Sequence, residues 1–206
     1  MSDTVFVTRS YSSYLTMAAR AISDIFSPAG LAIPCVMLGV WSCDEPGAYR
    51  YAILYSLIAI PMPLLYVIWL VKSGRVSDFH LPNRQDRYIP FAISIGATLA
   101  AVALLIYFGA PSEFMAPVSA ALILTAAMFV ITLGWQISIH TSTTSGLVTF
   151  AALAFGGPAL LLLLLVPLVM WARLYLGRHT VAQTLAGAAL GSVIFTTMFA
   201  LRGIVW

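Results

Sequence analysis

Charge-free stretches divide the chain into segments with the length of membrane-spanning helices. A helix takes about 20 apolar residues to cross roughly 30 Å of hydrocarbon. Windows without Asp, Glu, Lys or Arg cover residues 25–43, 51–71, 88–112, 114–172 and 179–201. Four of these windows fit one helix each, and the window 114–172 has room for two or three.

Helix-breaking residues divide the long window 114–172. A Gly-Trp-Gln sequence at 134–136 ends one apolar run, and a Gly-Gly-Pro sequence at 156–158 joins two helix breakers to a proline that favours a helix start. We therefore expect three helices in this window, over about 116–133, 138–155 and 158–173.

Taken together, the segments predict an all-α fold, a polytopic transmembrane helix bundle with six to seven spans. The first segment, about 25–42, contains Pro28 and Pro34 and adds the seventh span if it crosses the bilayer rather than lying in the interface. No linker or internal repeat divides the chain, so residues 1–206 are expected to form one integral membrane domain. Its first span would serve as the uncleaved insertion signal.

The amino-acid composition agrees with a membrane protein. The chain is 61% hydrophobic and 8% charged, against roughly 45–50% and about 25% in soluble domains. So few charges cannot solvate a globule of 206 residues, which argues against a soluble enzyme, a disordered chain and a nucleic-acid-binding protein. The net charge of +3 reflects sparse charge, not a basic binding face.

The Gly-Gly-Pro hairpin at 156–158 brings distant polar residues to one membrane face. Its arms run from His140 to the turn and from the turn to Arg173, each about 16 residues or 24 Å of helix. Both arms therefore end at the same face, and the count of spans puts the polar loop 72–87 there as well. The three histidines and most arginines are expected on this side.

The positive-inside rule assigns an orientation, since Lys and Arg concentrate in short cytoplasmic loops. The other face has Arg50 and Arg202, and the converging face has the larger set: Arg9, Arg20, Lys72, Arg75, Arg84, Arg87, Arg173 and Arg178. Arginines that serve the chemistry of a site should not enter this count. Without Arg84, Arg87, Arg173 and Arg178 the converging face still has more basic residues than the other face, by a smaller margin. We therefore expect a multi-pass membrane protein whose converging face is cytoplasmic.

The stretch around Arg173 and His179 has the residues for phosphate chemistry. Arg173 ends one expected helix and His179 opens the next, with Gln183 one turn further on the same face. A guanidinium can donate two parallel hydrogen bonds to phosphate oxygens, and a neutral imidazole can attack phosphorus. The alternative is that Arg173 and Arg178 are interfacial anchors and that His179 is a polar helix start.

Two further segments bring polar side chains to the same face. His140 stands in the charge-free window, where a histidine is costly unless it has a partner or faces water, and it could protonate a leaving group. Alternatively, it belongs to a helix-capping cluster with Ser138. In the loop 72–87, Arg84 and Arg87 share a helix face and could clamp one phosphate. The alternative is a solvated basic loop.

Together these segments resemble the membrane type-2 phosphatidic acid phosphatase family. The family carries three motifs: Lys…Arg-Pro, Pro-Ser-Gly-His and Ser-Arg-x5-His-x3-Asp. Arg173 and His179 have the spacing of the third motif. Ser138 and His140 match the second motif, and Arg87 matches the arginine of the first. The resemblance covers about 72–191, over half of the chain.

The resemblance implies a lipid-phosphate phosphatase without a cofactor or a metal ion. His179 would be the nucleophile that forms a phosphohistidine, and His140 would protonate the leaving alkoxide. Arg173 would bind the phosphoryl group and stabilise the transition state. The remaining phosphate ligands would be Arg87, Arg84, Ser138 and His80. The substrate would be a phosphatidate-like, phosphatidylglycerol-phosphate-like or polyprenyl-phosphate lipid of the bilayer.

The sequence departs from the family motifs at several positions. Ala172 replaces the serine of the third motif, and Gln183 replaces the aspartate that orients the nucleophilic histidine. A glutamine carbonyl can accept from an imidazole N–H but cannot stabilise an imidazolium by charge, and Asp86 is a second candidate for the orienting role. In the first motif no lysine has the expected spacing, and His80 stands seven residues before Arg87 instead.

Other functions stay open. A catalytically weak relative would bind lipid phosphates without turnover. A metal-dependent membrane enzyme would use His80, His140 and His179 with Asp78 or Asp86, although nearby arginines would repel a cation. A prenyltransferase-like enzyme would bind magnesium through the two aspartates.

The expected partners are the bilayer and a lipid phosphate, and no nucleic acid. The last helix carries Gly187 and Gly191 at GxxxG spacing, which permits close helix contact. We expect this contact within the chain rather than between two copies, and an oligomer has no other support in the sequence.

Overall fold

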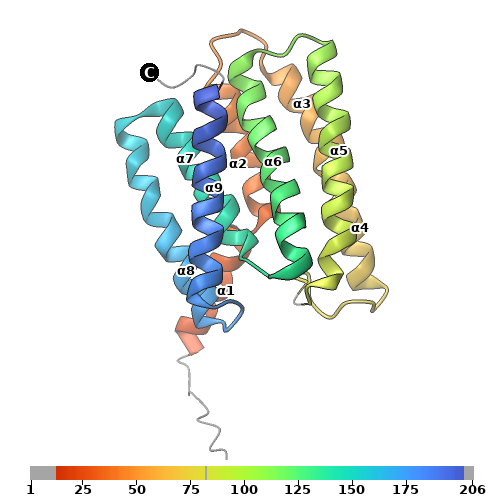
Figure 1. Cartoon of the computed structure of the whole chain (residues 1–206), viewed down its shortest axis with the longest axis vertical. Helices are drawn as coiled ribbons and strands as arrows, with labels where there is room; N and C mark the ends of the chain where they lie inside the picture. The colour runs from red at the N-terminus through yellow and green to blue at the C-terminus, as the bar shows by residue number, and fades with distance from the viewer. Residues whose placement is uncertain (1–12, 82, 202–206) are drawn as a thin grey trace, which may run out of the picture.

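Residues 13–81 and 83–201 are described by the computed structural model, and their regular structure is entirely helical. In chain order (Figure 1) the elements are α1 (Ser13–Ile25), α2 (Pro28–Trp41), α3 (Tyr49–Ala59), α4 (Pro61–Lys72), η1 (Gln85–Arg87), α5 (Tyr88–Tyr107), α6 (Ser112–Gly134), α7 (Ile139–Phe155), η2 (Gly157–Leu164), α8 (Leu165–Tyr175) and α9 (Val181–Leu201). The all-α prediction is confirmed for these residues. Arg9 and Arg202, which entered the charge count, lie outside the described ranges.

Several helices are long and apolar enough to cross a membrane, so the chain is a multi-pass membrane protein. Within the described ranges, five segments qualify by length and composition: Tyr49–Lys72, Gln85–Tyr107, Ser112–Gly134, Gly157–Tyr175 and Val181–Leu201. The pair α1 and α2, bent by 49° at its break, would add a sixth. A count of six agrees with the lower end of the expected range of six to seven, and α7, with 17 residues, is not among the six. A span takes about 20.

Capping and proline residues decide where the helices are interrupted. The Ser27 hydroxyl accepts from an amide of the first turn of α2 at 3.1 Å, and Pro28 opens that helix, so α1 and α2 are separate. Pro61 divides the second charge-free window into α3 and α4. Gly156, with φ of 66°, turns the chain from α7 into η2 at the expected hairpin.

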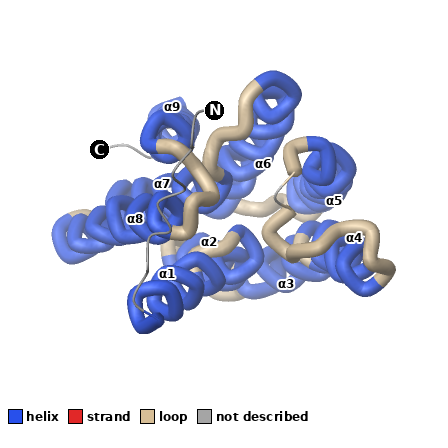
Figure 2. The backbone as a smooth tube through the Cα atoms, turned by 90° about the horizontal axis from the view of Figure 1, so that it is seen from below, coloured by secondary structure: helices blue, strands red, loops and turns tan. Residues whose placement is uncertain are grey.

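Helix α7 forms the centre of one half of the bundle. It packs against α9, α8, η2, α2 and α6, and Figure 2 shows it between α9, α8 and α2 in the view along the bundle. Helices α3, α4 and α5 pack together, and α6 adjoins them through α5. The buried face of α7 carries hydroxyl groups, among them Thr141, Ser142, Thr144 and Ser145.

Glycines let the backbones of α7 and α9 touch. A Cβ atom on Gly187 would lie 2.6 Å from the Ser138 carbonyl oxygen, and one on Gly191 would lie even closer to the Ser142 carbonyl oxygen. Only glycine fits at positions that close to a neighbouring backbone. The expected packing of the GxxxG pair within the chain is therefore confirmed.

Hydrogen bonds reinforce the contact between α7 and α9. Thr141 Oγ1 donates to the Thr184 carbonyl oxygen at 3.1 Å, and Ser145 Oγ donates to the Ala188 carbonyl oxygen at 2.7 Å. Hydroxyls that bond across helices in this way stabilise packing where little water competes for them. The beginning of α7 is therefore fixed against the first half of α9.

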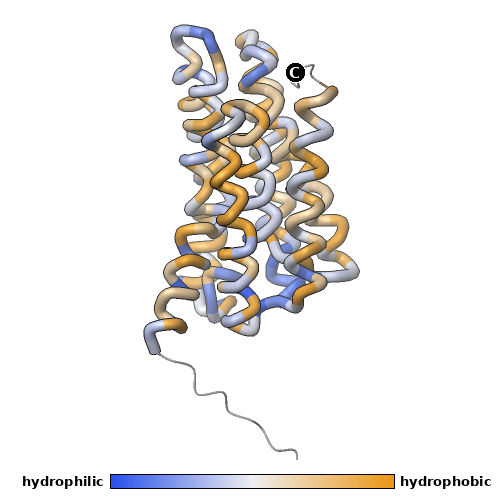
Figure 3. The backbone as a smooth tube through the Cα atoms, turned by 90° about the vertical axis from the view of Figure 1, so that its left-hand side faces the viewer, coloured by the Kyte–Doolittle hydropathy of each residue, from blue (hydrophilic) through white to orange (hydrophobic). Residues whose placement is uncertain are grey.

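Polar residues gather at the two ends of the bundle, with apolar residues between them (Figure 3). The α4–α5, α6–α7 and α8–α9 connections meet at the lower end in Figure 1. Arg84 Nη1 donates to the Gly134 carbonyl oxygen at 2.6 Å, and Arg178 Nη2 donates to Asp78 Oδ2 at 2.7 Å. These contacts confirm the expected convergence of the three connections on one face.

Replacing Gly191 by alanine should lower the thermal midpoint of the purified protein in detergent, because the added methyl group overlaps the Ser142 carbonyl. Overpacking of this kind costs about 1–3 kcal/mol. Gly96→Ala on α5 is the matched control, since no atom lies within 4 Å of its added Cβ. Alanine favours a helix over glycine by about 1 kcal/mol. Equal midpoints for the two variants would contradict the close contact.

Candidate active site

Four ionisable side chains from three parts of the chain are buried at the lower end of the bundle. Arg87 precedes α5, His140 lies in the first turn of α7, Arg173 lies in the last turn of α8, and His179 precedes α9. Each is 8% exposed or less. His140 is within electrostatic range of the other three and of His80. The structure therefore brings together these four residues, which the three sequence motifs had suggested for one site.

Most of the hydrogen-bonding capacity of this cluster is unused. Among the described residues, no partner is found for Arg87 Nη1, Arg173 Nε, either ring nitrogen of His140, or His179 Nε2. Buried polar atoms in proteins are nearly always hydrogen-bonded. So many unpartnered nitrogens around one point indicate a site for a ligand that accepts hydrogen bonds.

The two buried arginines have only neutral partners in the described part of the chain. Arg87 donates from Nε to the Leu81 carbonyl oxygen at 2.8 Å and from Nη2 to the His80 carbonyl oxygen at 3.3 Å. Arg173 donates from Nη1 to Ser23 Oγ at 2.5 Å. No carboxylate of the described residues forms an ion pair with either arginine.

Two of the more exposed arginines, in contrast, form ion pairs. Arg178 contacts Asp78 at 2.7 Å, and Arg50, at the opposite end of the bundle, contacts Glu45 at 2.5 Å. A buried charge without a counter-charge is costly, so a bound anion would compensate the pair of buried guanidiniums.

His179 is held by the first turn of α9. Its Nδ1 lies 3.2 Å from Gln183 Oε1, which also accepts from the Thr180 backbone N–H at 2.9 Å. The Gln183 backbone N–H donates back to Thr180 Oγ1 at 3.3 Å, which completes a capping box at the helix start. An amide oxygen only accepts, so Nδ1 carries the proton, and the lone pair belongs to the buried Nε2.

Burial, with the nearby charges of Arg173 and Arg87, lowers the pKa of His179 to about 4. Hydrogen bonds to Gln183 and to the Gln136 backbone oppose this shift without reversing it. The imidazole is therefore neutral near pH 7 and has a lone pair for nucleophilic attack.

His80 contacts the cluster through His140. Its ring stacks on His140 with 5.4 Å between the centroids. Its Nδ1 lies 3.1 Å from Asp78 Oδ1, and its Nε2 lies 3.3 Å from Asp24 Oδ1. The next residue, Leu81, has φ of 48°, a conformation uncommon outside glycine, and it accepts the bond from Arg87. The loop is thus folded around the arginine.

Asp78 ties this loop to the α8–α9 connection through its contact with Arg178. Its partial burial favours the neutral acid, but hydrogen bonds from His80 and Arg178 outweigh that effect and lower the pKa of Asp78 to about 2. The carboxylate is therefore charged at any ordinary pH, and it fixes His80 and Arg178 on either side of the site.

Three of the residues that the sequence suggested for the site have other partners. Arg84 donates to the carbonyl that ends α6. The fully buried Ser138 hydroxyl accepts from the Thr141 backbone N–H at 3.4 Å and caps α7. Asp86 accepts from Asn83 Nδ2 at 3.0 Å, and the ring of His179 is held by Gln183 instead. These contacts favour the capping and loop interpretations for the three residues.

Sequence reasoning missed Ser23 and Asp24 at the end of α1. Ser23 contacts Arg173, 150 positions further along the chain, and Asp24 contacts His80. Their only signal in the sequence is that a hydroxyl and a carboxylate stand together just before the first charge-free window.

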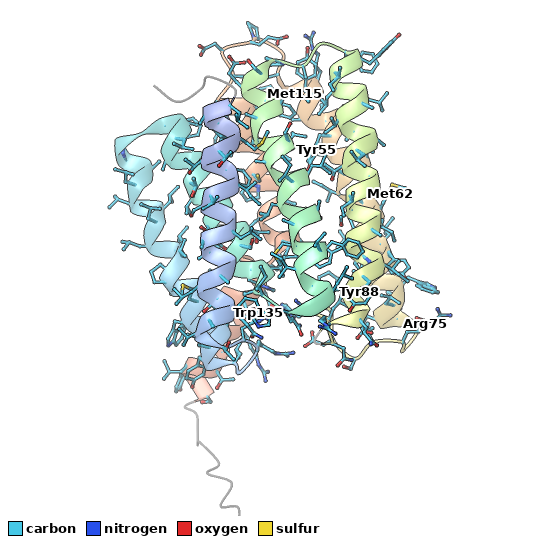
Figure 4. The ribbon with its side chains drawn as sticks, viewed as in Figure 1. Tyr55, Met62, Arg75, Tyr88, Met115 and Trp135 are labelled. Carbon is cyan, nitrogen blue, oxygen red and sulfur yellow. The ribbon has the colours of Figure 1, made fainter. Side chains whose placement is uncertain are left out.

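An apolar cavity of about 340 Å³ begins at the charged cluster and extends into the bundle. Arg87, His80 and His140 line one end of it, whereas Arg173 and His179 are not among its lining residues. Thr98 lines it eleven residues further along α5, or about 16 Å at the rise of a helix. Tyr55, another lining residue, lies higher in the bundle than Tyr88 in Figure 4.

No group of three or more His, Cys, Asp or Glu side chains is arranged to hold a metal ion in the described ranges. Among known proteins, no family model, no curated protein and no solved structure matches the chain.

His179→Gln should reduce the loss of stability in acid. Because burial lowers the pKa of His179 from 6.5 to about 4, the unfolded chain binds a proton between these values that the folded chain does not. Stability contributed by the neutral ring therefore falls as the pH decreases from about 6.5 to about 4. Thermal midpoints in detergent at pH 7.5, 5.5 and 4.5 should fall less steeply in the variant. Identical slopes would show that His179 titrates normally in the folded protein.

Proposed function

We propose that the chain is a membrane phosphatase that hydrolyses a phosphate monoester or diphosphate of a phospholipid or polyprenyl lipid through a phosphohistidine, without a metal ion. The observation that carries this proposal is the pair of buried arginines whose partners among the described residues are all neutral, next to a neutral histidine with a buried lone pair. A phosphate ester has the charge and the acceptor oxygens that this cluster lacks.

In this proposal the phosphoryl oxygens accept hydrogen bonds from Arg87 Nη1 and Arg173 Nε. The lone pair of His179 Nε2 forms a bond to phosphorus while the P–O bond to the lipid alcohol breaks. His140, which takes up a proton as the negatively charged phosphate binds beside it, gives this proton to the leaving oxygen and becomes neutral. The two guanidiniums stabilise the charge that develops on the phosphoryl oxygens.

Water completes the reaction. Neutral His140 takes a proton from the attacking water, whose oxygen bonds to phosphorus as the P–N bond to His179 breaks. Orthophosphate leaves, and both histidines return to their starting protonation states. The Gln183 amide holds the Nδ1–H side of the nucleophile throughout, so the lone pair of Nε2 keeps its direction.

The apolar cavity supports a lipid substrate. Its depth of about 16 Å along α5 is close to half of the roughly 30 Å of hydrocarbon in a bilayer. A hydrocarbon chain inside this cavity would hold its phosphate at the end lined by Arg87 and His140. A large soluble substrate has no apolar group that would fill this cavity.

We further propose seven spans, with α1 and α2 as one broken span and α7 as a short span of 17 residues, and a cytoplasmic site. The lower end of the bundle carries most of the described basic residues: Arg20, Lys72, Arg75, Arg84, Arg87, Arg173 and Arg178. Arg50 lies at the other end, before α3. The excess of basic residues supports the cytoplasmic side.

A second candidate is a protein of the same kind that binds lipid phosphates without turnover. One contact favours it, because Gln183 is neutral and cannot stabilise positive charge on His179. This candidate shares the anion site and the cavity with the phosphatase, and the two differ only in whether phosphate is released.

Phosphate release decides between these candidates. Purified protein in detergent should release orthophosphate from phosphatidate, phosphatidylglycerol phosphate, or a polyprenyl phosphate or diphosphate with EDTA present. His179→Gln should lower kcat by about a thousandfold or more, as loss of a nucleophile does. Arg75→Ala is the matched control for basic residues of the loop, since its guanidinium lies over the Trp69 ring, 4.4 Å from the centroid.

Each other outcome contradicts the proposal in a different way. Release that EDTA abolishes and Mg²⁺ or Zn²⁺ restores would indicate a metal-dependent enzyme. Binding of these lipids by a wild-type protein that releases no phosphate would favour the second candidate. Equal loss of activity in Arg75→Ala and His179→Gln would show that the assay follows folding instead of chemistry.

A further inference from the structure

Arg173 is held in place by a residue from the other end of the described chain. Its Nη1 donates to Ser23 Oγ at 2.5 Å, and 150 positions separate the two residues. Both side chains are buried, each with 2% of its surface exposed. Ser23 lies in the last turns of α1, which packs against α8, the helix that carries Arg173.

The partner is a hydroxyl, which has a specific electrostatic consequence. A carboxylate at this position would form a buried ion pair and cancel the charge of the guanidinium. A hydroxyl accepts the hydrogen bond and fixes the side chain, but it leaves the full positive charge for another ligand. The unpartnered Nε of Arg173 provides a donor for that ligand.

The residue after Ser23 contacts a second part of the site. Asp24 lies 3.3 Å from His80 Nε2, and the His80 ring stacks on His140. The Asp24 side chain is 65% exposed, so this contact contributes less than the buried contact of Ser23. The two contacts together show that the end of α1 packs against the site and contacts polar side chains of two other segments.

Building on the proposed phosphatase, we infer that Ser23 is a positioning residue of the anion site. It orients the Arg173 guanidinium toward the phosphate and, because it is neutral, keeps the charge of Arg173 available. Helix α1 is thereby a part of the site, although it precedes every segment that carries a catalytic group.

Substitutions that change charge and size separately test this role. The probe is inorganic phosphate, whose binding to the full-length protein in detergent is measured by isothermal titration calorimetry at pH 7. Thermal midpoints are measured on the same samples. The set consists of wild type, Ser23→Thr, Ser23→Ala and Ser23→Asp, with Ser13→Ala as the control at an exposed serine of the same helix.

The expected order of affinity follows from the contact. Ser23→Thr keeps the hydroxyl and should bind phosphate within about threefold of wild type, with a small penalty for its extra methyl group. Ser23→Ala frees the guanidinium and should weaken binding about tenfold, as loss of a hydrogen bond to a charged group does. Ser23→Asp should weaken it on the order of 100-fold, since the new carboxylate occupies and neutralises Arg173.

The aspartate variant also separates positioning from a purely structural role. A buried ion pair with Arg173 should keep the thermal midpoint at or near that of wild type while phosphate affinity falls. If Ser23 served folding alone, affinity and midpoint would fall together across the series. If Ser23→Asp fails to fold, the phosphate affinities of the other two variants decide between these roles. Threonine keeps the hydroxyl that Arg173 contacts and alanine lacks it, so positioning requires tighter binding in Ser23→Thr than in Ser23→Ala.

The results also distinguish this inference from the proposed function. Wild-type binding with equal affinities for Ser23→Asp and wild type would overturn the role of Ser23 and leave the phosphatase standing. Absence of phosphate binding in the wild type would overturn the anion site itself and the role of Ser23 with it. Weaker binding in Ser13→Ala than in Ser23→Ala would also contradict a specific contact.

Discussion

The close contact between the backbones of α7 and α9 is the constraint on which the site depends. The backbone of α7 lies so close to Gly187 and Gly191 that neither position has room for a side chain. The Ser138 backbone N–H donates to the Gln183 carbonyl oxygen at 3.1 Å, which ties the start of one helix to the start of the other. Because His140 follows Ser138 by two residues and Gln183 holds the His179 ring, this contact sets the two histidines relative to each other.

A second constraint is electrostatic. Two guanidiniums lie buried at the end of an apolar bundle, and their partners in the described chain are carbonyl and hydroxyl oxygens. Carboxylates are present close by, but Asp78 is occupied by Arg178 and His80. The site is thus organised with its positive charge uncancelled, at a cost in stability that a bound phosphate would offset.

Much of this arrangement was predictable from the sequence, and the reasons are physical. Charge-free windows predict apolar helices because the bilayer excludes charge. A Gly-Gly-Pro turn between arms of equal length predicts that His140 and Arg173 end at the same face. The spacing of Arg173, His179 and Gln183 fixes their relation through local helix geometry, since Gln183 lies four residues after His179. These predictions concern local or topological features, which a sequence pattern encodes.

The features that sequence reasoning missed depend on tertiary contacts. Ser23 has no local signal that it will meet an arginine 150 positions away. Ser138, Arg84 and Asp86 carry the right chemistry for a phosphate site, but their nearest partners are helix ends and a neighbouring asparagine. A hydroxyl nevertheless reaches Arg173, although the adjacent position 172 is an alanine, because α1 folds onto α8.

Detection of the covalent intermediate tests the central claim most directly. Protein mixed with a ³²P-labelled lipid phosphate and quenched within milliseconds in alkali should retain one label that acid removes, as a phosphohistidine does. Mass spectrometry should place the phosphoryl group on His179, and the label should be absent from His179→Gln. Phosphate release by the wild type without a labelled protein, or with a label that persists in His179→Gln, would contradict the account.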